Sequence, residues 1–189
     1  MQVTELHEDV ARAALRRLGI DRLVLSVHQV SFPASGDDLG HGAPASRRGL
    51  HLLGFAAGLG FTGVALGPAG ITTPVNRSPY DGTLFSRSPL ALSLEPLTGP
   101  AWGGLLDRGE LEAAAGDRPG TDSRANYAYS HVTVHRLLSA FHLAVQRRPG
   151  AVPGLAERLD AFRAASPWLA AEARFEAIAA AVGHDDPSL

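Results

Sequence analysis

The chain has 189 residues, a length that suits one domain, and 45% of them are hydrophobic, which is enough for a core. A net charge of −2 gives no reason to expect nucleic-acid or anionic-membrane binding, and the lack of cysteine excludes disulfides, thiolate metal sites and cysteine nucleophiles. No stretch approaches the roughly 18 apolar residues of a membrane-spanning helix, and the acidic side chains within residues 1–9 are unlike a signal peptide, so we expect a cytoplasmic protein.

The first half of the sequence predicts a strand–helix–strand unit. After a helix over residues 8–18, an apolar and β-branched run at 23–30 predicts a buried strand. A second helix is expected at 48–58 and a second strand at 62–66. Strands joined through a crossover run parallel, so these two strands should form a parallel pair.

Two loops rich in proline and glycine follow the predicted strands. The first covers residues 31–46 and the second residues 67–82. Long loops inside compact domains are often functional, and in parallel α/β folds the loops after the strands line the ligand site. A short extended segment is expected at 90–94.

The second half is predicted to be helical. Apolar periodicity indicates helices at 105–115, 127–147 and 154–182. A proline at position 167 cannot continue the last of these helices. We therefore expect a break there and a restart with Ser166 as the N-cap.

The order of four short motifs carries a resemblance to a known family. They are Ser31-Phe32-Pro33, Asp37-Asp38-Leu39-Gly40, Val64-Ala65-Leu66-Gly67-Pro68 and Ser78-Pro79-Tyr80. In this order they resemble the opening of the amylomaltases, the 4-α-glucanotransferases, in which a Ser-Pro-Tyr loop helps to line the sugar site. Further along the chain, four residue pairs stand in the same order as a pattern in that family's helical subdomain: Asn126-Tyr127, Leu137-Leu138, Phe162-Arg163 and Trp168-Leu169.

The resemblance implies an α/β fold: a partial (β/α) barrel-like unit with few parallel strands, plus a helical subdomain. The barrel-derived segment would cover residues 1–100 and the helical subdomain residues 101–189, packed as one compact domain. The family's catalytic carboxylates lie on later barrel strands that have no counterpart here, whereas retaining glycosyl transfer needs two carboxyl groups about 5 Å apart. Glucanotransferase activity by the family mechanism is therefore not expected.

Two residues are the candidates for acid/base catalysis. His28 stands at the end of the first predicted strand, where α/β folds place ligand-facing groups, although it could instead only hydrogen-bond a backbone carbonyl of the following loop. Asp38 could serve as a general base beside a pocket. Its adjacent partner, Asp37, leaves turn formation as the alternative, because aspartate side chains often bond their own backbone.

Four further residues are candidates for substrate binding. Tyr80 resembles the loop tyrosine that packs on sugar in amylomaltases, and a loop tyrosine serves either as a stacking platform or as a core anchor. Asp81 and Arg87 lie beside it and could bind polar substrate groups. Ser31 belongs to the first family motif.

The predicted helix over 127–147 carries a polar stripe beside its apolar face. Tyr127, His131, His135 and His142 lie on this stripe at about 100° per residue. The first three are candidates to line a substrate pocket. His131 and His135 are four residues apart, a spacing that permits joint metal ligation. No third ligand is evident apart from His28, His41 or His51, and we expect no bound metal.

We expect His28, Asp38 and Tyr80 to converge on one pocket, with that helical stripe as its wall. Asp107 and Glu157 are expected on solvated helix faces, where replacement should have little effect.

Two functions remain open at this point. The first is a small-molecule enzyme repurposed from the amylomaltase fold, which would carry out isomerisation, cyclisation or elimination by acid/base chemistry without a cofactor. The second is a non-catalytic protein that binds a sugar or docks onto a partner enzyme. Because two or three strands cannot close a barrel, we also expect a homodimer or a partner protein to cover the open sheet edge.

Overall fold

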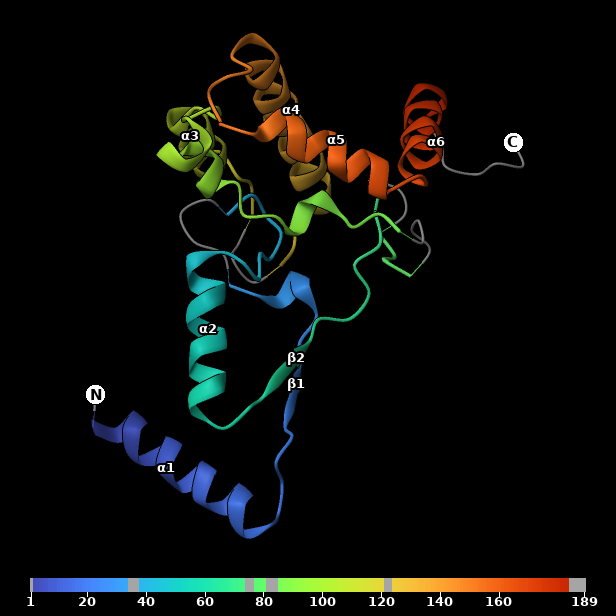
Figure 1. Cartoon of the computed structure of the whole chain (residues 1–189). Coiled ribbons are helices and arrows are strands. Elements are labelled where there is room, and N and C mark those ends of the chain that lie inside the picture. Colours follow the sequence, from blue (N-terminus) through green and yellow to red (C-terminus); the bar gives the residue numbers. More distant parts are fainter. Residues whose placement is uncertain (1, 34–37, 74–76, 81–84, 121–123, 184–189) are drawn as a thin grey trace.

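The computed structural model describes residues 2–33, 38–73, 77–80, 85–120 and 124–183 (Figure 1). Over these residues the chain forms α1 (Gln2–Arg17), β1 (Val24–Ser26), α2 (Arg47–Gly58), β2 (Gly63–Ala65), α3 (Arg108–Gly116), α4 (Tyr127–Arg147), α5 (Leu155–Ala165) and α6 (Leu169–Val182). The 3₁₀ turns are η1 (Gln29–Ser31), η2 (Pro89–Ala91), η3 (Glu95–Thr98) and η4 (Pro100–Trp102). Figure 1 shows α1, α2 and the sheet at one end of the molecule and α3 to α6 at the other.

The two strands pair in parallel, with Leu25 opposite Val64 at the centre of the register. The predicted strand–helix–strand unit is therefore confirmed. The fold is mostly helical with this one parallel pair, which is compatible with an α/β class. No third strand joins the pair within the described residues, so a barrel-like unit is not shown.

The first strand is shorter and more exposed than the sequence predicts. It ends at Ser26, and the chain turns into η1 three residues later. Val24 is 57% exposed. The prediction of a buried strand over 23–30 is wrong, because an isolated pair of strands leaves each strand with an unpaired edge and little surface to pack against.

The helix α1 is attached to the C-terminal end of α2. Nε of Arg12 donates a hydrogen bond to the carbonyl of Gly58 at 2.8 Å, and a second guanidinium nitrogen donates to that of Ala57 at 3.3 Å. The last carbonyls of a helix have no partner within it and form the negative end of its dipole. One arginine side chain therefore both caps α2 and holds α1 against it.

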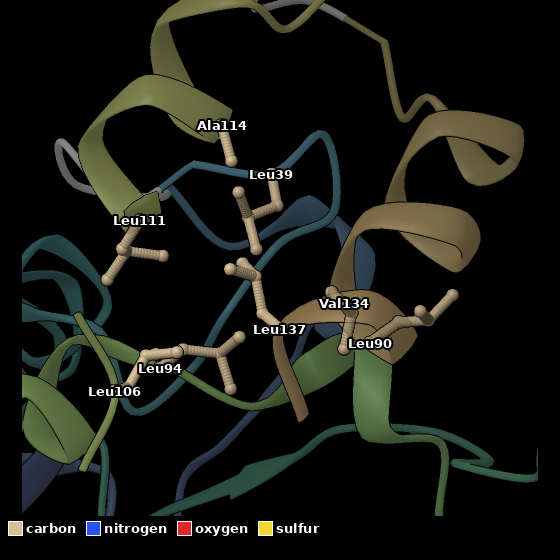
Figure 2. Packing of buried hydrophobic residues seen from close by; sticks show 8 residues of the cluster. All are labelled: Leu39, Leu90, Leu94, Leu106, Leu111, Ala114, Val134 and Leu137. Carbon is tan, nitrogen blue, oxygen red and sulfur yellow. The ribbon is translucent and has the colours of Figure 1, made fainter. Parts of the chain in front are cut away.

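The main hydrophobic core lies between α3, α4 and the loop that precedes α2. Val134 and Leu137 of α4 are completely buried, and Figure 2 shows them in one cluster with Leu39 of that loop. The buried members are Leu39, Leu90, Leu94, Leu106, Leu111, Ala114, Val134 and Leu137. They come from both the 1–100 and the 101–189 segments, so the first loop is tied into the helical end of the molecule.

A second, smaller cluster attaches α5 to α4. Its buried residues are Leu105, Val152 and Leu155. Trp102 packs against them and meets Phe141 of α4 edge to face, with ring centroids 5.8 Å apart. Aromatic pairs favour this geometry, because the positive ring edge meets the negative ring face.

The last helix is held by a polar and an aromatic contact. The rings of Phe85 and Trp168 stack with centroids 5.6 Å apart, and the hydroxyl of Ser86 donates to the Glu172 carboxylate. The predicted break in the last helix is confirmed, but Ser166 as the N-cap of the restarted helix is wrong. It is the C-cap of α5, because its amide donates back to a carbonyl of that helix.

Local capping overrides two further predictions. Residues 90–94 are not extended at their start, since Pro89 opens η2 and the hydroxyl of Ser88 accepts a hydrogen bond from the Leu90 amide. Asp107 is exposed as predicted, but it is the N-cap of α3 instead of a residue on the helix face, and its Oδ1 accepts from the Glu110 amide at 2.8 Å. A cap of this kind stabilises a helix by about 0.5–2 kcal/mol.

None of the helices in the described part of the chain has the length and apolar character needed to cross a bilayer. At the sheet end of the molecule, large apolar side chains such as Val24, Leu50 and Leu66 are exposed to solvent. A second copy or a partner protein that covers this end stays a prediction.

Candidate functional site

A cavity of about 1080 Å³ opens where the first loop, the end of α3 and the start of α4 meet. We call it the large cavity. Its lining comes from the segments 30–33, 38–42, 112–118 and 124–127, and from Arg48 and Arg77. One wall is thus a loop beyond a parallel strand, the position at which α/β folds bind ligands.

The loop wall of the large cavity is fixed to α4. The side chain of Leu39 is buried in the core, while its carbonyl accepts a hydrogen bond from the Ser130 hydroxyl at 2.7 Å. The next carbonyl, that of Gly40, accepts from the Asn126 amide, also at 2.7 Å. Gly40 has φ +88°, and a Cβ there would lie 3.1 Å from Ser130 Oγ, so glycine suits this position.

A second glycine packs the same loop against η1. A Cβ on Gly42 would lie 2.4 Å from the carbonyl oxygen of Gln29 and 2.6 Å from that of Val30. No side chain fits at those distances, so this residue has to be glycine for the loop to close. The histidine between the two glycines is therefore held at a fixed place in the cavity wall.

That histidine, His41, is the most distinctive group in the large cavity. It is 7% exposed, and its Nδ1 lies 3.0 Å from the carbonyl oxygen of Gly42. A carbonyl can only accept, so Nδ1 carries the hydrogen and Nε2 keeps its lone pair. The ring also meets Tyr127 edge to face, with centroids 5.5 Å apart.

Burial lowers the pKa of His41 below its usual value, because the charged imidazolium is poorly solvated there. The Gly42 carbonyl raises this pKa, the neighbouring His28 lowers it and the Asp38 carboxylate raises it, each to a smaller extent than burial. The imidazole is therefore neutral at pH 7, with an available acceptor nitrogen.

Asp38 is in the large cavity as predicted, but its carboxylate already has partners. One oxygen accepts from the Gly40 amide at 2.7 Å, which is the turn chemistry that its sequence context allows. The other lies 3.1 Å from a guanidinium nitrogen of Arg118, whose side chain is 11% exposed. This arrangement makes Asp38 an organiser of the loop and of one arginine.

Arginines dominate the charge of the large cavity. The charged lining side chains are Arg48, Arg77, Arg118, Arg124, Asp38 and Glu112. The excess of positive charge contrasts with the chain as a whole, whose net charge is −2. A smaller cavity of about 590 Å³ shares Arg77, Arg124 and Tyr127 with the large one, so the two are adjoining.

Of the predicted site residues that the structure describes, Ser31, Asp38 and Tyr127 line the large cavity. His28 is not among the described lining residues. Its Nδ1 accepts from the Val30 amide at 3.4 Å and caps η1, so it bonds to the following loop through an amide and not through the predicted carbonyl. It affects the site through its charge interaction with His41.

The tyrosine of the second loop does not line the large cavity. Tyr80 is 78% exposed and lies outside the described lining, so the expected convergence with Asp38 is not observed. Its position follows from a local turn, in which its amide donates to the Ser78 hydroxyl. Arg87 is exposed and also lies outside this lining, while Asp37 and Asp81 fall outside the described residues.

The histidine pair on α4 lies away from the large cavity, in contrast to the predicted wall. The rings of His131 and His135 have centroids 4.5 Å apart, as their spacing predicts. Burial lowers both pKa values, and for His131 the neighbouring His135 lowers it further. Among the residues that the structure describes, no set of three His, Asp or Glu side chains is arranged to hold a metal ion.

Sequence reasoning considered His41 only as a possible metal ligand, and it missed the arginines that line the large cavity. The available signal was the sequence Gly40-His41-Gly42, since glycines in a loop mark positions that need a positive φ or a close backbone approach. The arginines gave no such signal, because they are spread over more than seventy positions and meet only in the fold.

No family model, curated protein or solved structure matches this chain. The resemblance to amylomaltases stays a prediction carried by its motifs, and the chemistry of the site has to follow from its own residues.

Proposed function

We propose that the protein is a cofactor-independent enzyme that moves a proton within a small molecule bound in the large cavity, with His41 as the base. The observation that carries this proposal is the hydrogen bond from Nδ1 of His41 to the Gly42 carbonyl. It leaves Nε2 as a proton acceptor on a side chain that lines the cavity.

The chemistry follows from the environment of this imidazole. Nε2 takes a proton from a C–H or O–H group of the substrate and forms an imidazolium, while the electron pair of the broken bond stays on the substrate. Burial disfavours the imidazolium, so the proton returns readily to another atom of the same molecule. Abstraction followed by return is an isomerisation, one of the reaction types that the sequence favours.

Other lining groups supply substrate contacts in this proposal. Tyr127 offers a ring face and a hydroxyl beside His41, and Ser31 offers a second hydroxyl. Both residues belong to motifs that resemble the amylomaltases, so a polyhydroxylated substrate agrees with the sequence. Asp38 and Arg118 keep the loop in place rather than react, because each binds the other.

Solvent deuterium exchange tests the proposal across a panel of candidate substrates. The full chain is incubated in D₂O with sugars, sugar phosphates, hydroxy acids and keto acids, and ¹H NMR follows the loss of C–H signals. A base that removes a proton in D₂O can return a deuteron from the solvent, so the substrate becomes deuterated. We expect exchange or conversion of at least one compound.

The variant His41→Asn should slow that exchange by about 100-fold or more, the usual contribution of a general base. His51→Asn, on the exposed side of α2, is the matched control and should keep the wild-type rate. His41→Gln serves as a second variant if the first does not fold. Equal rates in the wild type and the His41 variants would refute the role of His41. Binding without exchange would favour the non-catalytic alternative instead.

A further inference from the structure

We infer that the ligand of the large cavity carries a phosphate monoester, bound by Arg77 and Arg124 where the large and small cavities join. This inference rests on the proposed function for the reacting part of the ligand, and it deepens that function by assigning the ligand class. The carrying observation is the position of the two arginines, since both line both cavities.

Both carboxylates in the described lining of the large cavity have arginine partners. Asp38 pairs with Arg118 at 3.1 Å, and Glu112 lies 3.9 Å from Arg108 on the surface of α3. Within the described part of the chain, neither Arg77 nor Arg124 has an ion pair. Two guanidinium groups at one junction thus have no compensating charge from the described residues.

An anion is the complement of this arrangement. Guanidinium groups present a planar fork of N–H donors that matches the oxygens of phosphate or carboxylate in pairs. A phosphate monoester has a charge near −2 at neutral pH and three acceptor oxygens, whereas a monocarboxylate has a charge of −1 and two oxygens. Two arginines therefore fit the phosphate better. The start of α4 lines the small cavity as well, and its dipole acts in the same direction.

Different parts of the ligand would lie at the junction and in the large cavity. Tyr127 lines both cavities and its ring contacts that of His41, so it connects the arginine junction with the wall that holds His41. With its phosphate at the junction, a small phosphorylated molecule extends its uncharged polar part into the large cavity. Anchoring the non-reacting phosphate would orient the reacting atoms toward the base.

Titration calorimetry with the full chain tests this inference. The probes are inorganic phosphate, glucose 6-phosphate, glucose and acetate at low ionic strength, where charge interactions are least screened. We expect glucose 6-phosphate and phosphate to bind more tightly than glucose or acetate. Arg77→Gln and Arg124→Gln should each weaken phosphate binding by about tenfold or more, the effect of losing a hydrogen bond to a charged group. Arg158→Gln, on the exposed side of α5, is the matched control and should bind as the wild type does.

The outcomes separate this inference from the proposed function. Phosphate binding that is lost in both junction variants but kept in His41→Asn supports the phosphate site, whether or not His41 is a base. Absence of phosphate binding at about 20 mM, roughly twentyfold above a weak Kd of about 1 mM, would overturn the inference. So would acetate binding as tight as that of phosphate, or equal affinity in the junction variants and the wild type. None of these results bears on deuterium exchange by His41.

Discussion

The two ends of the molecule are built from similar local signals but differ in what they bury. α2 at the sheet end and α4 at the helical end are both regular helices that begin at a side-chain N-cap, Ser46 and Asn126. On α4, Leu137 is completely buried, whereas Leu50 of α2 is 57% exposed. Helix formation is thus local at both ends, but burial depends on partners from distant parts of the sequence. The large cavity lies where those partners meet.

The largest test of this contrast is a cavity-creating substitution in the core of the helical end. Leu137→Ala should lower the free energy of unfolding by about 2–5 kcal/mol, because it removes buried methyl groups and leaves a void. Leu143→Ala, on the same helix but 47% exposed, and Leu50→Ala in α2 should cost about 1 kcal/mol or less. Urea unfolding measures all three, and equal costs would show that the ends are equally well packed.

The second test concerns the Asp107 cap, which the sequence analysis overlooked although Asp107 is followed three residues later by Glu110. Asp107→Ala should lower the free energy of unfolding by about 1 kcal/mol, since the Glu110 amide loses its acceptor. Asp107→Asn keeps an acceptor oxygen and should recover most of the loss. Glu157→Ala, an exposed acidic residue on α5, should change stability by about 0.5 kcal/mol or less. If Asp107→Ala costs no more than Glu157→Ala, the cap is not stabilising.

The sheet end can be tested through the attachment of α1. Arg12→Ala removes both hydrogen bonds to the end of α2 and should destabilise this contact by about 0.5–1.5 kcal/mol. Hydrogen exchange should then speed up in α1 and at the end of α2 while α4 keeps its protection. Arg16→Ala, also exposed on α1, is the control. Faster exchange throughout α4 would mean that the two ends unfold as one unit.

The smallest expected effect is a pH dependence of stability. Burial lowers the folded-state pKa of His41, His131 and His135, so below about pH 6.5 the unfolded chain binds protons that the folded chain does not. The free energy of unfolding should therefore decrease as the pH falls through and below that value. The double variant His131→Asn/His135→Asn should flatten the profile, and His51→Asn should not. A melting temperature that rises on acidification would contradict the sign.

Helices could be predicted from the sequence because they depend on neighbours along the chain, and the pair was predicted to be parallel because a helical crossover joins its strands. The bounds of α4 agree with the apolar periodicity of 127–147 and with an asparagine at its start. The predicted burial of the first strand was wrong, because burial depends on other elements packing against the strand, and the described residues place few of them beside this two-stranded sheet. Asp38 was found through a motif, whereas the role of His41 was overlooked since that role depends on a hydrogen bond to the next carbonyl and on burial by α4.

The central claim is that His41 presents a neutral imidazole with its lone pair on Nε2. A two-dimensional ¹H–¹⁵N correlation spectrum of the imidazole, recorded on ¹⁵N-labelled protein as a function of pH, measures this directly, because protonated and unprotonated ring nitrogens differ widely in chemical shift. We predict the Nδ1–H tautomer at neutral pH and protonation only below about pH 6.5. An Nε2–H tautomer, or an imidazolium that persists above that pH, would contradict the proposed role of His41.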